Sequence, residues 1–218
     1  MKKNFLQKNI FLKKEGDSYF NRNKDAVSIA SGLGNKLYEK FLRKHDRILE
    51  IGCSNGDNLN YFQTRKKCQC FGIDPSVKAI LAGKKKYPAI KLDVGTADKL
   101  NFPDEYFNFV FFGFCLYLID RPLLLRCIAE ADRVLKNRGL LGVTDFDTKI
   151  PFKRPYKHRK GVYVFKYDYQ KLFESCPHYT LIEKISYSHS TDYFVEGIQE
   201  RLSTVILYKD YDLAYIKG

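Results

Sequence analysis

The stretch Glu50-Ile-Gly-Cys-Ser-Asn-Gly56 decides the fold of this chain. It overlaps the end of an apolar segment, Arg47–Ile51, and its two glycines let the backbone turn sharply and approach a ligand closely. In open parallel sheets, ligands bind outside the carboxyl ends of the strands, near the first crossover. Asp74 lies eighteen residues after the stretch, where an acidic residue can accept hydrogen bonds from ribose hydroxyls. The pattern predicts a strand, a ligand-binding turn and a helix, with Asp74 on the ribose of the ligand.

The same turn indicates the charge of that ligand. A dinucleotide-binding turn reads G-x-G-x-x-G, whereas this chain reads G-x-x-x-G with Ser54 in the middle. Glu50 would repel phosphates and attract a cationic, amino-bearing ligand. We therefore favour a cationic nucleoside over a pyrophosphate. An NAD-type domain, or a relative that no longer binds a cofactor, is the alternative interpretation.

Working outward from the turn, apolar segments alternate with amphipathic ones. We expect strands at residues 47–51, 70–73, 90–94, 107–112 and 140–144, helices at 24–44, 57–66, 121–136 and from near Ser76, and two final strands at 179–188 and 202–209. Strands and helices at this spacing imply βαβ units with right-handed crossovers and a parallel sheet. Residues 146–170 are basic and aromatic and have no clear period.

Length and composition favour one domain. The 218 residues and the apolar content of 44% suffice for a single well-packed core. The longest apolar run, 109–119, is too short to span a bilayer. Gln7, Lys8 and Lys13 interrupt the apolar stretch that a signal peptide requires. We expect a cytoplasmic protein without a membrane span.

The charge and the cysteines narrow the class of ligand further. A net charge of +13 implies attraction to anions, whether nucleic acid, nucleotide-linked substrates or acidic lipid. The basic residues gather at 84–86 and at 153–160. The six cysteines include no C-x-x-C pair, so we expect inert thiols and no metal site.

With these motifs in place, the chain resembles the class I S-adenosylmethionine-dependent methyltransferases in their small-molecule branch. The first motif of that family is an acid followed by G-x-G-x-G, and it falls on Glu50, Gly52, Ser54 and Gly56. Further segments that resemble the family are Gly72–Pro75, Gly95–Asp98, Phe107–Val110 and Arg133–Lys136. The similarity covers residues 46–145 well and the two final strands loosely. It implies an α/β, Rossmann-like, seven-stranded and mostly parallel sheet with helices on both faces and an antiparallel last strand.

The resemblance also implies S-adenosylmethionine as the cofactor and a set of residues that hold it. The family often carries Asp where this chain has Thr96, so either Thr96 or Asp98 would contact the adenine amine. Leaders in this branch often fold over the cofactor. The residues expected at the cofactor are Glu50, Gly52, Cys53, Ser54, Gly56, Asp74, Pro75, Thr96, Ala97, Asp98 and Phe114, with Tyr19 and Arg22 from the leader. The single domain, 1–218, then divides into a leader and helical segment (1–44), a cofactor-binding core (45–145) and a substrate loop with the final strands (146–218).

Methyl transfer needs alignment of the acceptor with the methyl–sulfur bond, and a general base where the acceptor is a hydroxyl. Candidates for the base are Asp145, Asp147 and His158, each of which has a purely structural alternative. Tyr117 would line the acceptor pocket or pack beneath the loop. Basic residues interleaved with aromatics can hold phosphates while stacking on a base or sugar. The expected substrate-binding residues are Tyr117, Arg154, Tyr156, Lys157 and Arg159.

The leading acceptor class is a small anionic molecule, such as a nucleotide-linked sugar or glycan precursor. The segment Phe112–Tyr117 and the leader are similar to those of bacterial polysaccharide methyltransferases. An RNA methyltransferase is one alternative, although no N-P-P-[YF] motif follows the strand at 107–112. A non-catalytic binding protein of the same fold is the other alternative, because Ser54, Thr96 and Asn108 depart from the family pattern. The sequence makes no prediction of the oligomeric state.

Overall fold

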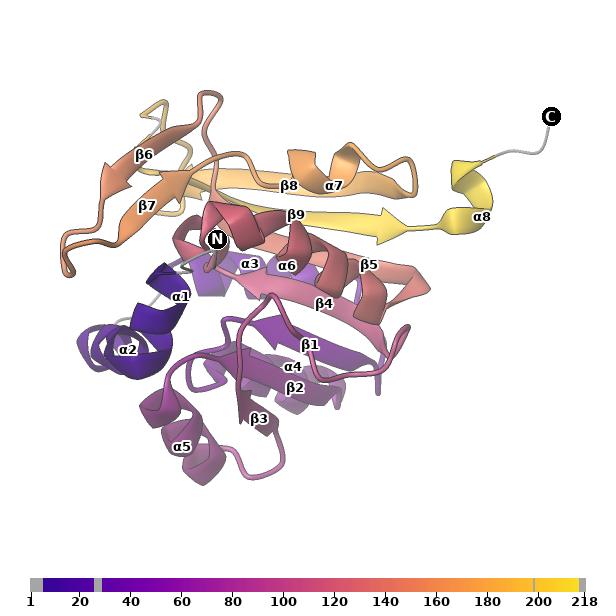
Figure 1. The fold of residues 1–218 in the computed structure, drawn as a ribbon. Helices are drawn as coiled ribbons and strands as arrows, with labels where there is room; N and C mark the ends of the chain where they lie inside the picture. Colours follow the sequence, from indigo (N-terminus) through magenta and orange to yellow (C-terminus); the bar gives the residue numbers. More distant parts are fainter. Residues whose placement is uncertain (1–5, 26–28, 198, 216–218) are drawn as a thin grey trace.

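One seven-stranded sheet forms the centre of the protein. The computed structural model describes residues 6–25, 29–197 and 199–215. The strand order is β3-β2-β1-β4-β5-β9-β8, and only β9 runs against the other strands (Figure 1). The strands are β1 (Arg47–Ile51), β2 (Gln69–Asp74), β3 (Lys91–Val94), β4 (Phe107–Gly113), β5 (Leu135–Phe146), β8 (Tyr179–Ser188) and β9 (Arg201–Lys209). The predicted fold class, including the antiparallel last strand, is confirmed.

Helices cover both faces of this sheet, because successive strand residues point to opposite sides. On one face, Ile48 and Phe109 pack in a cluster with α3 (Ile29–Glu39), α4 (Asp57–Lys66) and α5 (Val77–Lys86). On the other face, Leu49 and Val110 pack in a cluster with α6 (Arg121–Val134) and α7 (Lys171–Glu174). The continuous apolar run of β4 is therefore explained by burial on both sides.

Two segments depart from the expected element pattern. The helix predicted at 24–44 is α3, which ends at Glu39, while residues 24–25 form a turn and 26–28 lie outside the described residues. The region 146–170 contains a separate hairpin of β6 (Phe152–Pro155) and β7 (Tyr163–Lys166). Its strands have only four residues each, too few to show a period in the sequence.

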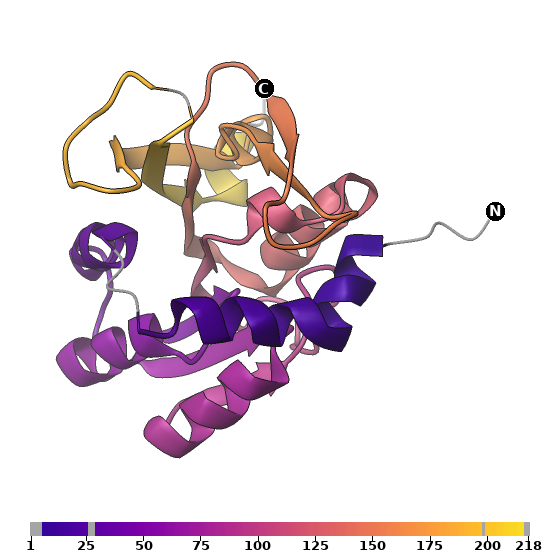
Figure 2. The same cartoon turned by 90° about the vertical axis from the view of Figure 1, so that its left-hand side faces the viewer.

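The leader folds into one helical stretch, which we call the leader helix. It consists of α1 (Leu6–Ile10), the π-helical turn η1 (Phe11–Glu15) and α2 (Gly16–Asn23). Figure 2 shows it in indigo, running across the molecule between the hairpin and α5. A short 3-10 turn, η2 (Leu116–Leu118), and the terminal α8 (Tyr211–Ala214) complete the described elements. Within the described ranges, no helix is both long and apolar enough to cross a bilayer.

Candidate active site

A cavity of about 310 Å³ opens at the carboxyl ends of β1, β2 and β4, beneath the leader helix. Most of the residues expected at the cofactor lie in its wall, although they come from five separate segments of the chain. Those that line it are Tyr19, Glu50, Gly52, Cys53, Ser54, Asp74, Pro75, Thr96, Ala97, Asp98 and Phe114. Gly56 and Arg22 lie outside the lining.

The turn after β1 is shaped by its first glycine. Gly52 has a φ of 81°, in the left-handed region, and a Cβ atom there would lie 2.7 Å from the Cβ of Cys115. Two features therefore exclude a side chain at this position: the left-handed backbone conformation and the close approach of the loop after β4. The backbone N–H of Ser54 donates to Asp74 Oδ2 at 2.9 Å, which ties the turn to the end of β2.

Asp74 is held between two backbone donors. Its Oδ1 accepts from the N–H of Ser76 at 2.8 Å, and its Oδ2 accepts from the N–H of Ser54 at 2.9 Å. Burial raises the pKa of the carboxyl to about 6 in spite of these bonds. A carboxylate oxygen accepts more than one hydrogen bond, so Asp74 retains capacity for ligand hydroxyls on the cavity side. This geometry fits the ribose contact predicted from the sequence.

Glu50 carries the most unusual electrostatics of the site. Asn58 Nδ2 donates to its Oε1 at 2.7 Å, but its Oε2 is buried without a hydrogen-bond partner among the described residues. Burial raises the pKa of this carboxyl to about 8. An unpaired buried carboxylate is costly, and a cationic amino group in the cavity would offset that cost.

The sequence analysis missed two residues that position Glu50. One is Asn58, on the first turn of α4, which supplies the hydrogen bond to Oε1. The other is Gly113, the last residue of β4: a Cβ atom there would lie 2.4 Å from Glu50 Oε1. Gly113 ends an apolar strand in the sequence, and only the pairing of β4 beside β1 brings it against this carboxyl.

The cavity is acidic although the chain is strongly basic. Its wall contains five carboxylates and two lysines, namely Glu50, Asp57, Asp74, Asp98 and Asp120 against Lys8 and Lys24. Such a wall attracts a cationic ligand and opposes a pyrophosphate. The structure therefore favours the cationic nucleoside over the dinucleotide.

The loop after β3 closes the cavity at the end expected for adenine. Asp98 forms an ion pair of 2.6 Å with Lys8 Nζ of the leader helix. Burial alone would raise the pKa of Asp98, but hydrogen bonds from Lys8 and Thr96 lower it below its ordinary value. Two residues were considered for the contact with the adenine amine. Asp98 is an ionised hydrogen-bond acceptor, and Thr96 donates a hydrogen bond to it.

An aromatic cluster lies beside the cavity, in the loop after β4. Phe114 lines the cavity, and its ring centroid lies 4.7 Å from that of Tyr117 and 5.3 Å from that of Phe146. The hydroxyl oxygens of Tyr117 and Tyr19 are 3.4 Å apart, so the leader helix touches this cluster. Tyr117 itself is buried behind Phe114 and outside the lining residues.

The candidate bases lie outside the cavity wall. Asp145 is buried, and its carboxylate accepts backbone N–H groups of Tyr117 at 3.3 Å and Phe146 at 2.8 Å. Burial raises the pKa of Asp145 to about 7. These bonds support the aromatic cluster from behind. His158 is exposed in the turn of the hairpin, with its ring 5.3 Å from that of Tyr156.

Asp147 belongs to a buried ion network at the end of β5. Its carboxylate contacts Lys184 Nζ at 3.0 Å and Arg201 Nε at 3.1 Å, and it accepts a hydrogen bond from Ser186 Oγ at 2.7 Å. All three partners come from β8 and β9. The observed arrangement is the structural alternative considered for this residue, since the carboxylate faces these strands and not the cavity.

The predicted substrate loop forms the hairpin, and the charged side chains of its turn face solvent. Lys157 and Arg159 are exposed in its turn, and Arg154 Nη1 reaches Gln199 Oε1 at 3.5 Å. None of these three cations forms an ion pair within the described part of the chain. Arg22 points to the hairpin instead of the cavity, because its Nη2 donates to Tyr156 Oη at 3.0 Å.

In comparisons with known proteins, the matches are to methyltransferases. Residues 48–139 match the family model described as a methyltransferase domain. A demethylmenaquinone methyltransferase of Lysinibacillus sphaericus is 38% identical over 73 residues, which cover 32% of this chain. This match spans about 30% of the length of that relative.

Solved structures support the same fold. A 1,6-didemethyltoxoflavin-N1-methyltransferase of Burkholderia thailandensis, with bound 1,6-didemethyltoxoflavin and S-adenosylhomocysteine, has a TM-score of 0.71 at 12% identity, covering 93% of this chain and 87% of that chain. A complex of a Haloferax volcanii methyltransferase with the Trm112 activator has a TM-score of 0.71 at 16% identity, covering 95% and 100%. An S-adenosylmethionine-dependent methyltransferase of Methanosarcina mazei has a TM-score of 0.63 at 18% identity, covering 80% and 97%.

Proposed function

We propose that this chain, a class I S-adenosylmethionine-dependent methyltransferase, transfers the methyl group to a small anionic acceptor such as a nucleotide-linked sugar or glycan precursor. The domain match over residues 48–139 and the shared fold support the predicted family and cofactor. The acceptor is our proposal, and it rests on the contrast between an acidic cavity and a basic hairpin beside it.

The residues present fit the cofactor. The unpartnered Oε2 of Glu50 suits its ammonium group, and Asp74 suits the ribose hydroxyls. Asp98, ionised and facing the cavity, suits the adenine amine. When bound, the cofactor supplies an activated methyl group on a sulfonium, so the protein needs chiefly to align the acceptor and exclude water.

The aromatic cluster and the leader helix would exclude that water. Phe114 and Tyr19 both line the cavity, and the hydroxyl of Tyr19 lies 3.4 Å from that of Tyr117. Burial raises the pKa of both phenols, so they stay protonated near neutral pH, and Tyr19, which lines the cavity, can donate a hydrogen bond to an acceptor oxygen or nitrogen. Asp145 positions this cluster through the backbone of Tyr117.

The anionic part of the acceptor would bind to Arg154, Lys157 and Arg159, which we name the hairpin cations. These three side chains form no ion pair among the described residues, so each is available for a charge-assisted hydrogen bond to a phosphate or carboxylate. The single observation that supports the proposal is this set of unpaired cations at the same end of the sheet as an acidic cavity.

A methyl-transfer screen with radiolabelled S-adenosylmethionine tests the proposal. Nucleotide sugars, anionic glycans and RNA are offered to the wild type and to a variant with all three hairpin cations replaced by Gln. We expect transfer to an anionic small molecule, with KM raised in the variant. RNA as the accepted substrate, with affinity falling steeply as salt rises, would support the RNA methyltransferase instead. Cofactor binding without transfer to any acceptor would support the non-catalytic alternative.

A further inference from the structure

The leader helix contacts the cofactor cavity along one side. Lys8 Nζ pairs with Asp98 at 2.6 Å at one end of the cavity. Further along the helix, Asp17 Oδ1 accepts a hydrogen bond from Ser76 Oγ at 2.7 Å, directly after Pro75 of the cavity wall. Asp98 follows β3 and Ser76 follows β2, so the helix is fixed to two neighbouring strands beside the cavity. A molecule in the cavity would therefore lie against this helix.

On its other side, the leader helix is bound to the hairpin through Gln7. The side-chain Oε1 accepts from the backbone N–H of Tyr163 at 2.9 Å. The Nε2 donates to the carbonyls of Tyr163 at 3.3 Å and Leu118 at 2.8 Å. The side chain of Gln7 is buried. Its amide bonds both the N–H and the C=O of Tyr163, as the backbone of a neighbouring strand would. One amide thus joins the leader helix, β7 and the loop after β4.

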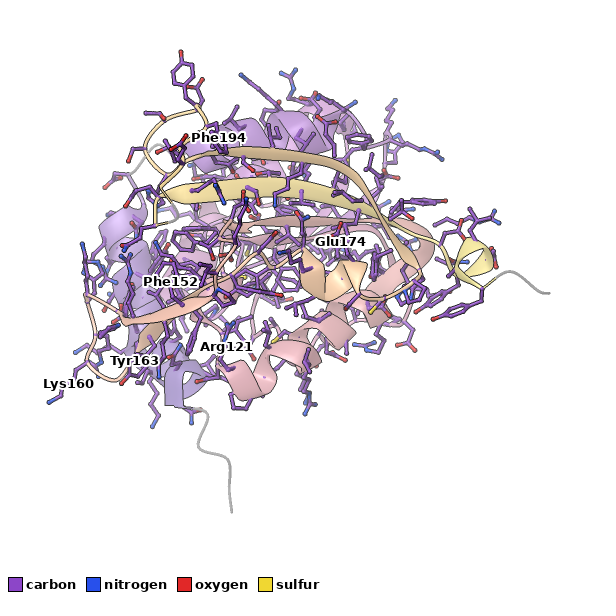
Figure 3. All side chains as sticks on the ribbon, turned by 90° about the horizontal axis from the view of Figure 1, so that it is seen from above. Arg121, Phe152, Lys160, Tyr163, Glu174 and Phe194 are labelled. Atoms are coloured by element: carbon purple, nitrogen blue, oxygen red, sulfur yellow. The ribbon has the colours of Figure 1, made fainter. Side chains whose placement is uncertain are left out.

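A second contact lies close to the turn of the hairpin. Arg22 Nη2 donates to Tyr156 Oη at 3.0 Å and to the buried Glu15 Oε1 at 2.6 Å. The turn that carries Lys157 and Arg159 begins directly after Tyr156. Figure 3 shows Lys160 at the free end of this turn and Tyr163 nearer the body of the protein. The leader helix therefore contacts the hairpin that carries the cations at two places, at Tyr163 and at Tyr156.

We infer that Gln7 is a positioning residue that couples cofactor occupancy to the order of the hairpin. A ligand that binds only when the leader helix is in place stabilises that position. The hydrogen bonds of Gln7 transmit the same stabilisation to Tyr163. Since coupling of this kind is reciprocal, an anion on the hairpin in turn tightens cofactor binding. This inference rests on the proposed function, and it predicts that the acceptor binds well only after the cofactor.

Hydrogen exchange measured by mass spectrometry tests the coupling without any acceptor. The full chain is labelled with and without S-adenosylhomocysteine, and peptides covering 52–58 and 155–165 are followed. In the wild type we expect slower exchange in both, by about fivefold or more in the hairpin, the lower end of measured couplings. Gln7→Met fills the same space without the hydrogen bonds, and should keep protection of 52–58 while losing that of 155–165. Gln63→Met is the matched control, because the side chain of Gln63 forms a single hydrogen bond among the described residues, to the Ala89 carbonyl at 3.3 Å, away from the leader helix and the hairpin.

The possible results separate the inference from the proposed function. Protection of 52–58 alone in the wild type overturns the coupling and leaves the cofactor assignment intact. Equal protection of the hairpin in wild type and Gln7→Met shows that Gln7 does not transmit it. Protection of neither peptide overturns the cofactor site itself. Where Gln7→Met fails to fold, Tyr156→Phe removes the second contact and should reduce hairpin protection, while unchanged protection counts against the inference.

Discussion

Glu50→Gln tests the reason for an unpaired carboxyl in the cavity. In the free protein, burial raises the pKa of Glu50 to about 8, so the carboxyl is mostly protonated at neutral pH. The ammonium group of the cofactor favours the ionised form. Binding should therefore release a proton from Glu50, and the affinity should rise with pH until the free carboxyl is ionised.

The magnitude follows from the ionised fraction. With a free-state pKa of about 8, raising the pH from 6 to 8 increases the ionised fraction about 50-fold, and the affinity rises with it. Removing the charge should cost about 1.5–3 kcal/mol at pH 8, as for a hydrogen bond to a charged group. This loss corresponds to about 10- to 150-fold in the dissociation constant.

Titration calorimetry with S-adenosylhomocysteine measures both effects. In buffers of different ionisation enthalpy at pH 7, the wild type should release about 0.9 proton, and Glu50→Gln should release far less. Asp74→Asn is the comparison variant, because it removes a carboxyl whose pKa is only about 6 and keeps Glu50, so its affinity should still rise with pH where that of Glu50→Gln does not. An affinity that is flat from pH 6 to 8 in the wild type, or a variant that binds like the wild type at pH 8, would refute the reasoning.

Three further outcomes are expected. Burial raises the pKa of Glu50 from 4.5 in the native state, so the free protein loses stability as the pH rises from about 4.5 to 8. Glu50→Gln should therefore raise the melting temperature at pH 8, and a lower melting temperature in this variant contradicts the burial argument. Gly113→Ala places a Cβ 2.4 Å from Glu50 Oε1 and should weaken cofactor binding in calorimetry, whereas Gly32→Ala, with open space around it, should not. Replacing the hairpin cations by Gln should leave the Kd for S-adenosylhomocysteine within about threefold when no acceptor is present, since the mutations lie outside the cavity; a parallel loss of cofactor binding means that the hairpin is structural.

Local sequence pattern was sufficient to predict the sheet, and most of the residues that the family resemblance implied for the cofactor line one cavity. The turn after β1 needs a glycine at Gly52 for a backbone with a φ of 81°, and an acid at the end of β2, and both requirements are visible in a short stretch. The alternation of strands and helices then fixes the topology through right-handed crossovers. Thirteen cofactor residues were predicted, and eleven line the cavity: ten lie at or after strand ends that a parallel sheet brings together, and Tyr19 comes from the leader helix.

The hairpin, the leader helix and the roles of the acids were decided by tertiary structure. Asp145 and Asp147 are only two residues apart, yet one supports the aromatic cluster and the other pairs with β8 and β9. Residues two apart face the same side of a sheet only while the strand is regular. No local sequence pattern indicates which distant segment of the chain covers each side. Gln7 and Asn58 gain their roles in the same way, from partners that lie elsewhere in the chain. The sequence alone thus determined the sheet and the cofactor turn, since both depend on neighbouring residues, whereas long-range packing decided which side chains the site could use.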